Sequence, residues 1–424
     1  MLKIHPFKIG LEDDMKKYYK RENYLKRIRG FYNDASMIKV ISGVRRCGKS
    51  CLMATIAQEL TESGVEDENI IFIDLDKRGF KNVKTQDQLE KVIDERATAK
   101  GLKYLFIDEV QNVDGFEEVL NAYQLEDEFS IFVTGSNAYL LSGELVTKLT
   151  GRYIEFEMLT LTFEEYLDMK KFLGKEVENL TTELDHYIHE GGFPQALTYD
   201  NEEDRRKYID SVIKEIFEKD IKRRVKIRNV SGFQKVQQYI INNFGATSSI
   251  TNLLESLNRA GISIKRNTLV HYIEILKDSK IIYECKRFDL KSKKSIGCAQ
   301  KYYLSDLGFW FATNTDNRIN YGPILENIVY CYALSKGYKI SIGRIGKLEC
   351  DFILRDSNMD YSYVQVSMTI MNDIKTEDRE YAPFEMIHDN YPKYLLTRND
   401  PIQKRNGIKH VNIPEFMADG KMFD

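Results

Sequence analysis

The sequence of 424 residues contains no long apolar run and no marked excess of one charge. No stretch approaches the ~18–20 consecutive apolar residues of a membrane-spanning helix, so we expect no membrane partner. Residues 1–6 lack the apolar core of a signal peptide, which favours a cytoplasmic location. The 62 basic and 65 acidic side chains give a formal net charge of −3, so any contact with nucleic acid has to be local.

Cysteine is scarce, and its spacing excludes the usual metal and disulfide frameworks. There is no C-x-x-C pair and no histidine at zinc-ligand spacing, so we expect all six thiols to be reduced. The six are Cys47, Cys51, Cys285, Cys298, Cys331 and Cys350.

Residues 43–50 read Gly-Val-Arg-Arg-Cys-Gly-Lys-Ser, which matches the phosphate-binding motif G-x-x-x-x-G-K-[ST]. A β-type stretch at 38–41 precedes the motif and a helical pattern at 51–57 follows it. Such a loop directs its backbone N–H groups and the positive end of the next helix at phosphates. An ordinary glycine-containing turn is the alternative. The predicted nucleotide-binding residues are Gly43, Val44, Arg45, Arg46, Cys47, Gly48, Lys49, Ser50 and Cys51.

The motif also predicts two roles in chemistry. Lys49 would reach the β- and γ-phosphates, and the Ser50 hydroxyl would ligate Mg²⁺. Residues 104–107 are apolar and are followed by Asp108 and Glu109, as in a strand covered on both faces. We predict Asp108 as the metal-side carboxylate and Glu109 as the catalytic base or water-positioning acid. Two solvated acids at the end of a strand are the alternative.

Two further segments offer polar groups to the same site. The apolar strand at 131–133 leads into Thr134, and Ser136 or Asn137 could then contact the γ-phosphate or the attacking water as a sensor. Thr134 could instead satisfy backbone groups. Arg152 could act as an arginine finger, in cis or from a neighbouring subunit, or pair with a surface carboxylate.

The first 160 residues alternate between apolar strands and helical segments. Alternation of this kind predicts an α/β fold, with a parallel sheet covered by helices on both faces. The expected strands are 38–42, 70–75, 104–108, 130–134 and 153–157.

Residues 230–310 have a different pattern, which is typical of a winged helix. Three helical stretches precede two strands joined by a basic turn at 291–294. The third helix, 267–279, would occupy the recognition position in the major groove of duplex DNA. A protein-interaction module and a merely solvated hairpin tip are the alternatives. The residues predicted to contact phosphates are Lys265, Arg266, Lys291, Lys293 and Lys294.

Together these motifs resemble a prokaryotic AAA-type P-loop ATPase family with a winged helix and a C-terminal domain of restriction-endonuclease-like fold. The resemblance implies ATP binding with Mg²⁺, and it favours hydrolysis. It divides the chain into a core at 1–160, a helical lid at 161–228, a winged helix at 229–312 and an endonuclease-like α/β domain at 313–424. The motifs that carry it are residues 43–50, 106–111, 134–137, 149–152, 191–194, 349–352 and 365–367.

The C-terminal segment departs from what nuclease chemistry requires. Glu326 and Asp351 match the first two acids of that fold, but Gln365 stands where a metal-binding Glu belongs, and Ser367 replaces the lysine. A neutral amide is a poor ligand for a hard cation. We therefore predict that this domain is catalytically inactive and docks a partner or nucleic acid.

The leading hypothesis is an ATPase whose nucleotide state moves domains that bind duplex DNA or a protein partner. The first alternative is an ATP-regulated, metal-dependent nuclease. The second is a regulator that binds nucleotide without hydrolysing it. An oligomer is compatible with all three.

Overall fold

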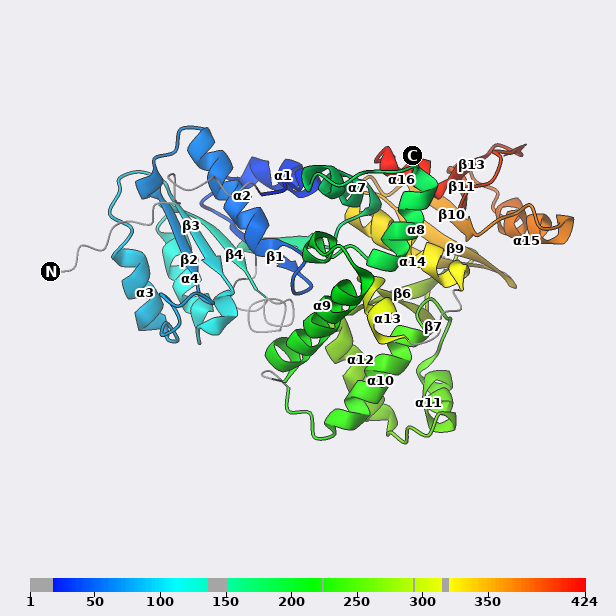
Figure 1. The fold of residues 1–424 in the computed structure, drawn as a ribbon, viewed down its shortest axis with the longest axis horizontal. Coiled ribbons are helices and arrows are strands. Elements are labelled where there is room, and N and C mark those ends of the chain that lie inside the picture. Colours follow the sequence, from blue (N-terminus) through cyan, green and yellow to red (C-terminus); the bar gives the residue numbers. More distant parts are fainter. Residues whose placement is uncertain (1–17, 136–148, 150, 223–224, 293, 315–319) are drawn as a thin grey trace. The chain divides into compact units, whose positions relative to one another are not determined.

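The computed structural model describes residues 18–135, 149, 151–222, 225–292, 294–314 and 320–424, with the side chains of 294–299 left aside. The chain forms two compact units, and the division between them falls between Met158 and Leu159 in the sequence (Figure 1). This division lies two residues from the predicted end of the core at residue 160. No helix in the described ranges is long and apolar enough to cross a bilayer.

The first unit is built on a sheet of five strands in the order β2-β3-β4-β1-β5. Every neighbouring pair in it is parallel, which confirms the sheet type predicted from the sequence. The strands are β1 (Ile38–Gly43), β2 (Ile70–Asp74), β3 (Lys103–Asp108), β4 (Phe129–Thr134) and β5 (Tyr153–Met158).

Helices cover this sheet because both of its faces are apolar. One face is aliphatic, with residues such as Ile73, Ile107 and Val133 packed in a single core with α3 (Gln86–Asp94) and α4 (Phe116–Leu125). Side chains alternate along a strand, so the intervening residues face the other side. There the stacked rings of Phe72, Phe106 and Phe132 cross three adjacent strands. Two further helices in the described part of this unit are α1 (Glu22–Ile28) and α2 (Lys49–Glu62).

The second unit opens with helices whose first turns are capped by short polar side chains. Thr162 and Glu165 form a reciprocal capping box at the start of α7, and Asn179 and Asn201 cap α8 and α9. These helices and the next ones are α7 (Phe163–Phe172), α8 (Leu180–Glu190), α9 (Glu202–Glu215), α10 (Val230–Asn242), α11 (Ile250–Arg259), α12 (Arg266–Asp278), α13 (Gly308–Thr313) and α14 (Tyr321–Ser335).

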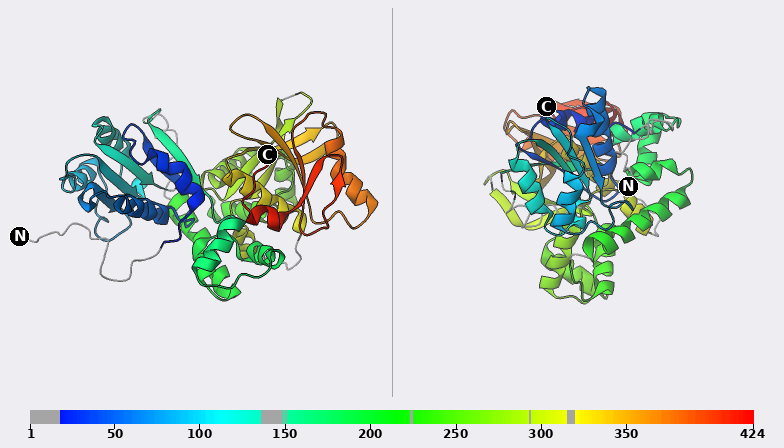
Figure 2. Two further views of the ribbon diagram at one scale, coloured as in Figure 1. Left: turned by 90° about the horizontal axis from the view of Figure 1, so that it is seen from above. Right: turned by 90° about the vertical axis from the view of Figure 1, so that its left-hand side faces the viewer.

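A mixed sheet of eight strands forms the rest of this unit, in the order β12-β13-β11-β10-β9-β8-β6-β7. In Figure 2 its orange and red strands lie next to one another. Its strands are β6 (Ile282–Asp289), β7 (Lys294–Leu304), β8 (Lys339–Ile345), β9 (Leu348–Arg355), β10 (Tyr361–Ser367), β11 (Lys393–Thr397), β12 (Lys404–Arg405) and β13 (Ile408–Asn412). The helices beside them are α15 (Ile374–Glu385) and α16 (Ile413–Ala418).

The hairpin β6–β7 belongs to this sheet. It pairs internally in antiparallel fashion, and β6 also pairs in parallel with β8 through Arg287, Phe288 and Asp289. The segments predicted as a winged helix and as a C-terminal domain therefore share one sheet, which the sequence pattern did not indicate.

Buried polar contacts hold the helices of the second unit together. The Lys170 ammonium on α7 donates to both carboxylate oxygens of Glu183 on α8, at 2.8 and 2.7 Å. Asp306 is wholly enclosed and accepts hydrogen bonds from the backbone N–H groups of Gly192 (2.8 Å) and Gly308 (2.7 Å). The Gly-Gly-Phe-Pro turn at 191–194 is thus fixed to the start of α13.

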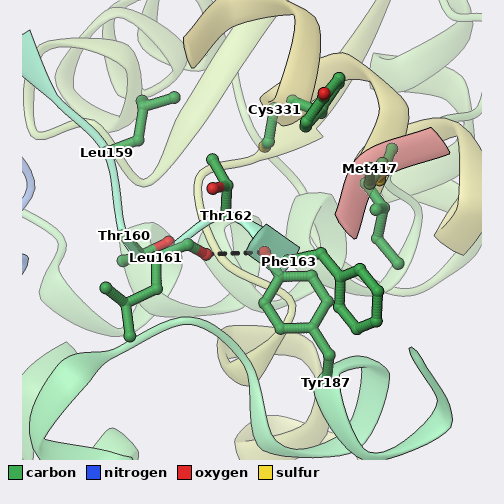
Figure 3. Close-up of a pocket in the computed structure, with 10 residues that line it drawn as sticks. Leu159, Thr160, Leu161, Thr162, Phe163, Tyr187, Cys331 and Met417 are labelled. Atoms are coloured by element: carbon green, nitrogen blue, oxygen red, sulfur yellow. Dashed lines mark hydrogen bonds between the residues drawn. The ribbon is translucent and has the colours of Figure 1, made fainter. Parts of the chain in front are cut away.

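A small cavity between α7, α8, α14 and α16 is a packing defect. Figure 3 shows the Phe163 and Tyr187 rings closing one side of it, with the Tyr187 hydroxyl donating to the Leu161 carbonyl at 2.8 Å. Its volume of about 10 Å³ leaves room for at most one water molecule. It is too small for a ligand site.

Candidate functional site

The predicted phosphate loop joins the carboxyl end of β1 to the first turn of α2. Gly43 has φ 141°, and a Cβ atom there would lie 2.1 Å from the Met158 carbonyl oxygen. Gly48 has φ 110° and precedes the helix as its N-cap. Glycine is required at Gly43 by both the conformation and the close approach, and it is favoured at Gly48 by the conformation alone.

The Lys49 side chain lies inside this loop. Its ammonium donates to the carbonyl oxygens of Gly43 at 3.0 Å and Val44 at 3.2 Å, and the residue is only 6% exposed. From outside the motif, the Arg21 guanidinium donates to the Cys47 carbonyl at 3.1 Å. The loop thus carries two cations at its backbone, which suits a polyanionic ligand.

Asp108 ends β3 and is buried beside the loop. The Ser50 and Thr134 hydroxyls both donate to its carboxylate. Burial raises the pKa of Asp108, and these two hydrogen bonds oppose the shift. The structure therefore brings the two predicted metal ligands, Ser50 and Asp108, into direct contact.

Glu109 has a left-handed backbone, with φ 58° and ψ 47°. Its N–H donates to Thr134 Oγ1 at 3.1 Å, and Gln111 Nε2 donates to its Oε2 atom. The Arg45 guanidinium lies 3.9 Å from the same carboxylate. A non-glycine residue holds this conformation at a cost, which these contacts offset.

Burial also raises the pKa of Glu109, while Lys49 and Arg45 lower it by stabilising the charged form. A carboxylate with a raised pKa is a better proton acceptor than an ordinary glutamate. The electrostatics of the site are therefore compatible with a general base at this position.

The outcome for the other predicted residues is mixed. Val44 and Cys47 are buried in the loop. Arg46 has a left-handed backbone, with φ 69°. Cys51 lies on an exposed part of α2, and burial raises the pKa of the Cys47 thiol, so that thiol is not activated. The sensor candidates Ser136 and Asn137 lie outside the described residues.

Arg152 does not reach the loop of its own chain, which corrects the prediction of a finger in cis. It precedes β5, and its carbonyl accepts from the N–H of Ile38 at the start of β1. The phosphate loop is at the other end of β1, roughly 20 Å away for six residues of strand. The Arg152 guanidinium donates to Asn121 on α4. A role toward a neighbouring subunit stays a prediction.

Sequence reasoning missed two residues of this site, Arg21 and Gln111, and one contact of Arg45. Arg21 acts on the loop from α1's N-cap position, and nothing in its local pattern indicates that contact. Arg45 was assigned to the phosphates, and its contact with Glu109 was not foreseen. Gln111 could have been found from the sequence, because a polar side chain two positions after an acid at the end of a strand can fold back and contact that acid.

A second feature is a basic hollow of about 440 Å³ beside the start of α12. Lys226, Arg228 and Lys265 line it, no acidic residue does, and none of these cations pairs with a described acid. Of the predicted phosphate contacts, Lys265 lies here, while the Arg266 guanidinium donates to Thr251 at 3.0 Å. Lys291 is exposed at the hairpin turn, Lys293 is outside the described residues, and the Lys294 side chain is not described.

A third feature is a hollow of about 590 Å³ on the eight-stranded sheet. It brings together Glu326, Asp351, Gln365 and Ser367, the residues compared above with a nuclease site. The acid Glu380, from α15, also lines it and accepts from Gln365 Nε2 at 2.9 Å.

An ammonium group stands among the acids of this hollow. Lys301 Nζ lies 2.9 Å from Glu326 Oε2 and 3.1 Å from Glu349 Oε1. Burial and the neighbouring Glu326 raise the pKa of Asp351 well above its usual range, which favours the neutral acid and disfavours a cationic ligand. Among the described residues, no group of three or more His, Cys, Asp or Glu side chains is arranged to hold a metal ion. The hollow therefore does not fit a divalent cation.

Two family models match parts of the chain. Residues 35–167 match one described as an AAA domain, and residues 181–317 match one described as a domain of unknown function (DUF8612). The first match includes the phosphate loop together with Asp108 and Glu109.

The chain is similar over most of its length to two relatives and to a solved structure. An uncharacterized protein of Haemophilus influenzae is 32% identical over 380 residues, which cover 89% of this chain and 92% of that protein. An uncharacterized protein of Methanocaldococcus jannaschii is 28% identical over 377 residues, covering 86% and 82%. A Walker-type ATPase of Pyrococcus abyssi has a TM-score of 0.47 at 16% identity, over 70% of this chain and 96% of that one.

Proposed function

We propose that the chain, whose residues 35–167 match an AAA domain, binds Mg²⁺-ATP and hydrolyses it beside Lys49, Asp108 and Glu109. One observation carries the proposal: Thr134 links Asp108 and Glu109 directly, within a site whose loop already holds Lys49. A site that only binds nucleotide has no need of a second, half-buried carboxylate held directly after β3.

The roles follow from the contacts of each side chain. The loop N–H groups and Lys49 bind the phosphates, and Lys49 exchanges its two carbonyl acceptors for phosphate oxygens. Ser50 and Asp108 supply a hydroxyl and a carboxylate oxygen, which are the ligand types that Mg²⁺ prefers. Bound there, the ion would neutralise charge on the phosphates. Glu109 orients the attacking water and takes its proton.

We propose adenine as the base because the chain resembles AAA-type ATPases. The absence of an Asn-Lys-x-Asp guanine-reading motif from the sequence agrees with it.

Duplex DNA is the partner we propose for the winged-helix segment, α10 to β7. The basic hollow beside α12 supports it, because three cations there, which pair with no described acid, attract a phosphate backbone. By contrast, basic residues on the preceding helix α9 pair with acids one turn earlier, as Arg206 does with Glu202 and Lys214 with Asp210. The nucleotide state would then alter how this segment is presented, as a switch.

The nuclease alternative is not favoured. Its acids surround Lys301, and the described residues offer no metal site there. We propose instead that the 590 Å³ hollow is catalytically silent and available to a protein partner or nucleic acid.

The test is phosphate release from Mg²⁺-ATP by wild type, Glu109→Gln and Lys49→Ala, each with and without duplex DNA. We expect Glu109→Gln to bind ATP normally and to lose turnover by about 10²–10⁴-fold. Lys49→Ala should lose tight ATP binding. Tight binding by wild type without any turnover, with or without DNA, would instead establish the non-hydrolysing regulator.

A further inference from the structure

Gln111 lies two residues after the proposed catalytic acid. It belongs to the short 3₁₀ turn Val110–Asn112, which follows Glu109 directly. The turn folds the Gln111 side chain back, and its Nε2 atom donates to Glu109 Oε2. Glu109 is therefore held by the Gln111 amide at its side chain and by Thr134 at its backbone N–H.

The other end of the Gln111 amide is unsatisfied. Its Oε1 atom is buried and accepts no hydrogen bond from any described residue. Leaving a buried acceptor without a donor costs about 1–3 kcal/mol. The amide cannot be turned round, since Oε1 would then face the ionised carboxylate of Glu109. Since none of the described residues donates to it, this atom is free to accept a hydrogen bond from a bound water molecule.

A lone unsatisfied oxygen does not mark a site, and the same unit contains a second example. Gln124 on α4 also has a buried Oε1 without a partner, and its Nε2 donates to the Ser36 carbonyl at 3.0 Å. Ser36 precedes β1, so Gln124 lies at the edge of the sheet opposite the phosphate loop. What distinguishes Gln111 is that its other amide group already holds Glu109.

We propose that Gln111 is a second water-binding residue of the ATPase site, whose Nε2 fixes the Glu109 carboxylate while its Oε1 accepts a hydrogen bond from the attacking water. This inference rests on the proposed ATP hydrolysis. In the step, a bond forms between the water oxygen and the γ-phosphorus, and the bond to the β–γ bridging oxygen breaks with its electron pair leaving on ADP. The proton that water loses goes to Glu109.

One rigid amide thereby places both partners of the proton transfer. Water held by Gln111 Oε1 and Glu109 has its oxygen directed at a fixed point, and the carboxylate cannot turn away from it. Orientation of this kind reduces the activation barrier without tightening ground-state binding of ATP. Loss of the amide should therefore lower kcat and leave the affinity for ATP nearly unchanged.

The experiment compares wild type with Gln111→Leu, Gln111→Glu and the control Gln124→Leu. Phosphate release gives kcat and KM, and a fluorescent ATP analogue gives affinity and shows that each variant is folded. Affinity for ADP with aluminium fluoride, which mimics the transferred phosphoryl group, reports the transition state. Gln111→Glu is nearly isosteric, so it keeps the test available if the leucine variant does not fold.

We expect both Gln111 variants to lose about 100-fold in kcat, with ATP affinity within a factor of about three of wild type. Both should also bind ADP with aluminium fluoride more weakly by a similar factor, whereas Gln124→Leu should match wild type in all three readouts. Unchanged kcat in both Gln111 variants, with wild type active, would overturn this inference and leave ATP hydrolysis standing. An inactive wild type would overturn the proposed function, and this inference with it.

Discussion

Thr134 and Asp108, from adjacent strands, are joined by a hydrogen bond from the threonine hydroxyl to Asp108 Oδ1. The same oxygen of Thr134 accepts the backbone N–H of Glu109 at 3.1 Å. One hydroxyl therefore satisfies groups on both acids, and it joins the end of β4 to the end of β3. The contact with the Glu109 N–H agrees with the role suggested for Thr134 from the sequence, which was to satisfy backbone groups.

Replacing this hydroxyl is the first test. Thr134→Val keeps the shape of the side chain, but it leaves the Glu109 N–H without its acceptor and leaves Asp108 with Ser50 as its hydroxyl donor. We expect the free energy of unfolding to fall by about 1–3 kcal/mol and turnover by about 10–100-fold. Thr134→Ser retains the hydroxyl and should stay close to wild type in urea unfolding and phosphate release. Equal behaviour of the two variants would contradict the assignment.

Gly43 offers a test of the loop geometry. In Gly43→Ala the new methyl group would lie 2.1 Å from the Met158 carbonyl, at a φ of 141° that alanine avoids. The loop has to move, so we expect tight ATP binding to be lost. Gly64→Ala is the matched control, because Gly64 also has a positive φ but nothing within 4 Å of the added Cβ. That variant should cost about 1 kcal/mol of stability and bind ATP normally.

Asp306 makes the stability of the second unit depend on pH. Burial raises the pKa of Asp306 to about 6 from 3.8. Between those values the folded chain keeps a proton that the unfolded chain releases, so stability falls as pH rises from about 4 to 6 and is level above that. The shift of about two pKa units corresponds to about 3 kcal/mol. Asp306→Asn cannot titrate, so wild type should exceed it in stability by about 3 kcal/mol more at pH 4 than at pH 7, as measured by urea unfolding.

Lys301 compensates two acids in the 590 Å³ hollow. Lys301→Met would leave Glu326 and Glu349 without their cation, although Arg287 still contacts Glu349. We expect the free energy of unfolding to fall by about 3 kcal/mol at pH 7. The double variant Lys301→Met with Glu326→Gln should recover part of that loss in urea unfolding. A single variant as stable as wild type would show that the pair contributes nothing.

The basic hollow beside α12 predicts a salt-dependent affinity for DNA. Lys226→Glu combined with Lys265→Glu should weaken binding of a short duplex, with little dependence on its sequence. The slope of log affinity against log salt should become shallower by about 0.9 for each lost phosphate contact. Lys222→Glu is the control, since Lys222 already pairs with Glu218 at 2.9 Å outside this hollow. If the control loses as much affinity, net charge alone explains the effect.

The sequence predicted the first sheet well because its signals are local. Each strand is a short apolar run, and the expected 104–108 and 130–134 differ from β3 and β4 by one residue at the start. The fixed residues of the phosphate loop carry their own geometry, which is why Gly43 and Lys49 were found without a structure.

What could not be predicted depends on partners distant in the chain. The strand order places β1 between β4 and β5, and only this order shows that Arg152 lies at the wrong edge for its own loop. Lys301 approaches Glu326 because β7 and α14 lie side by side, and no motif spans the two. A periodic pattern reports which face of a strand is buried, but not which strand is its neighbour.

The pairing of β6 with β8 also has a consequence for how parts of the gene can be exchanged by recombination. A recombination event that separated the chain near residue 312 would separate β6 from β8, although β6 would keep β7, and would leave an unpaired strand edge on each product. Such products should aggregate rather than serve as independent modules. Segments 229–312 and 313–424 are therefore expected to be gained, lost and exchanged among genomes together, as a single heritable block.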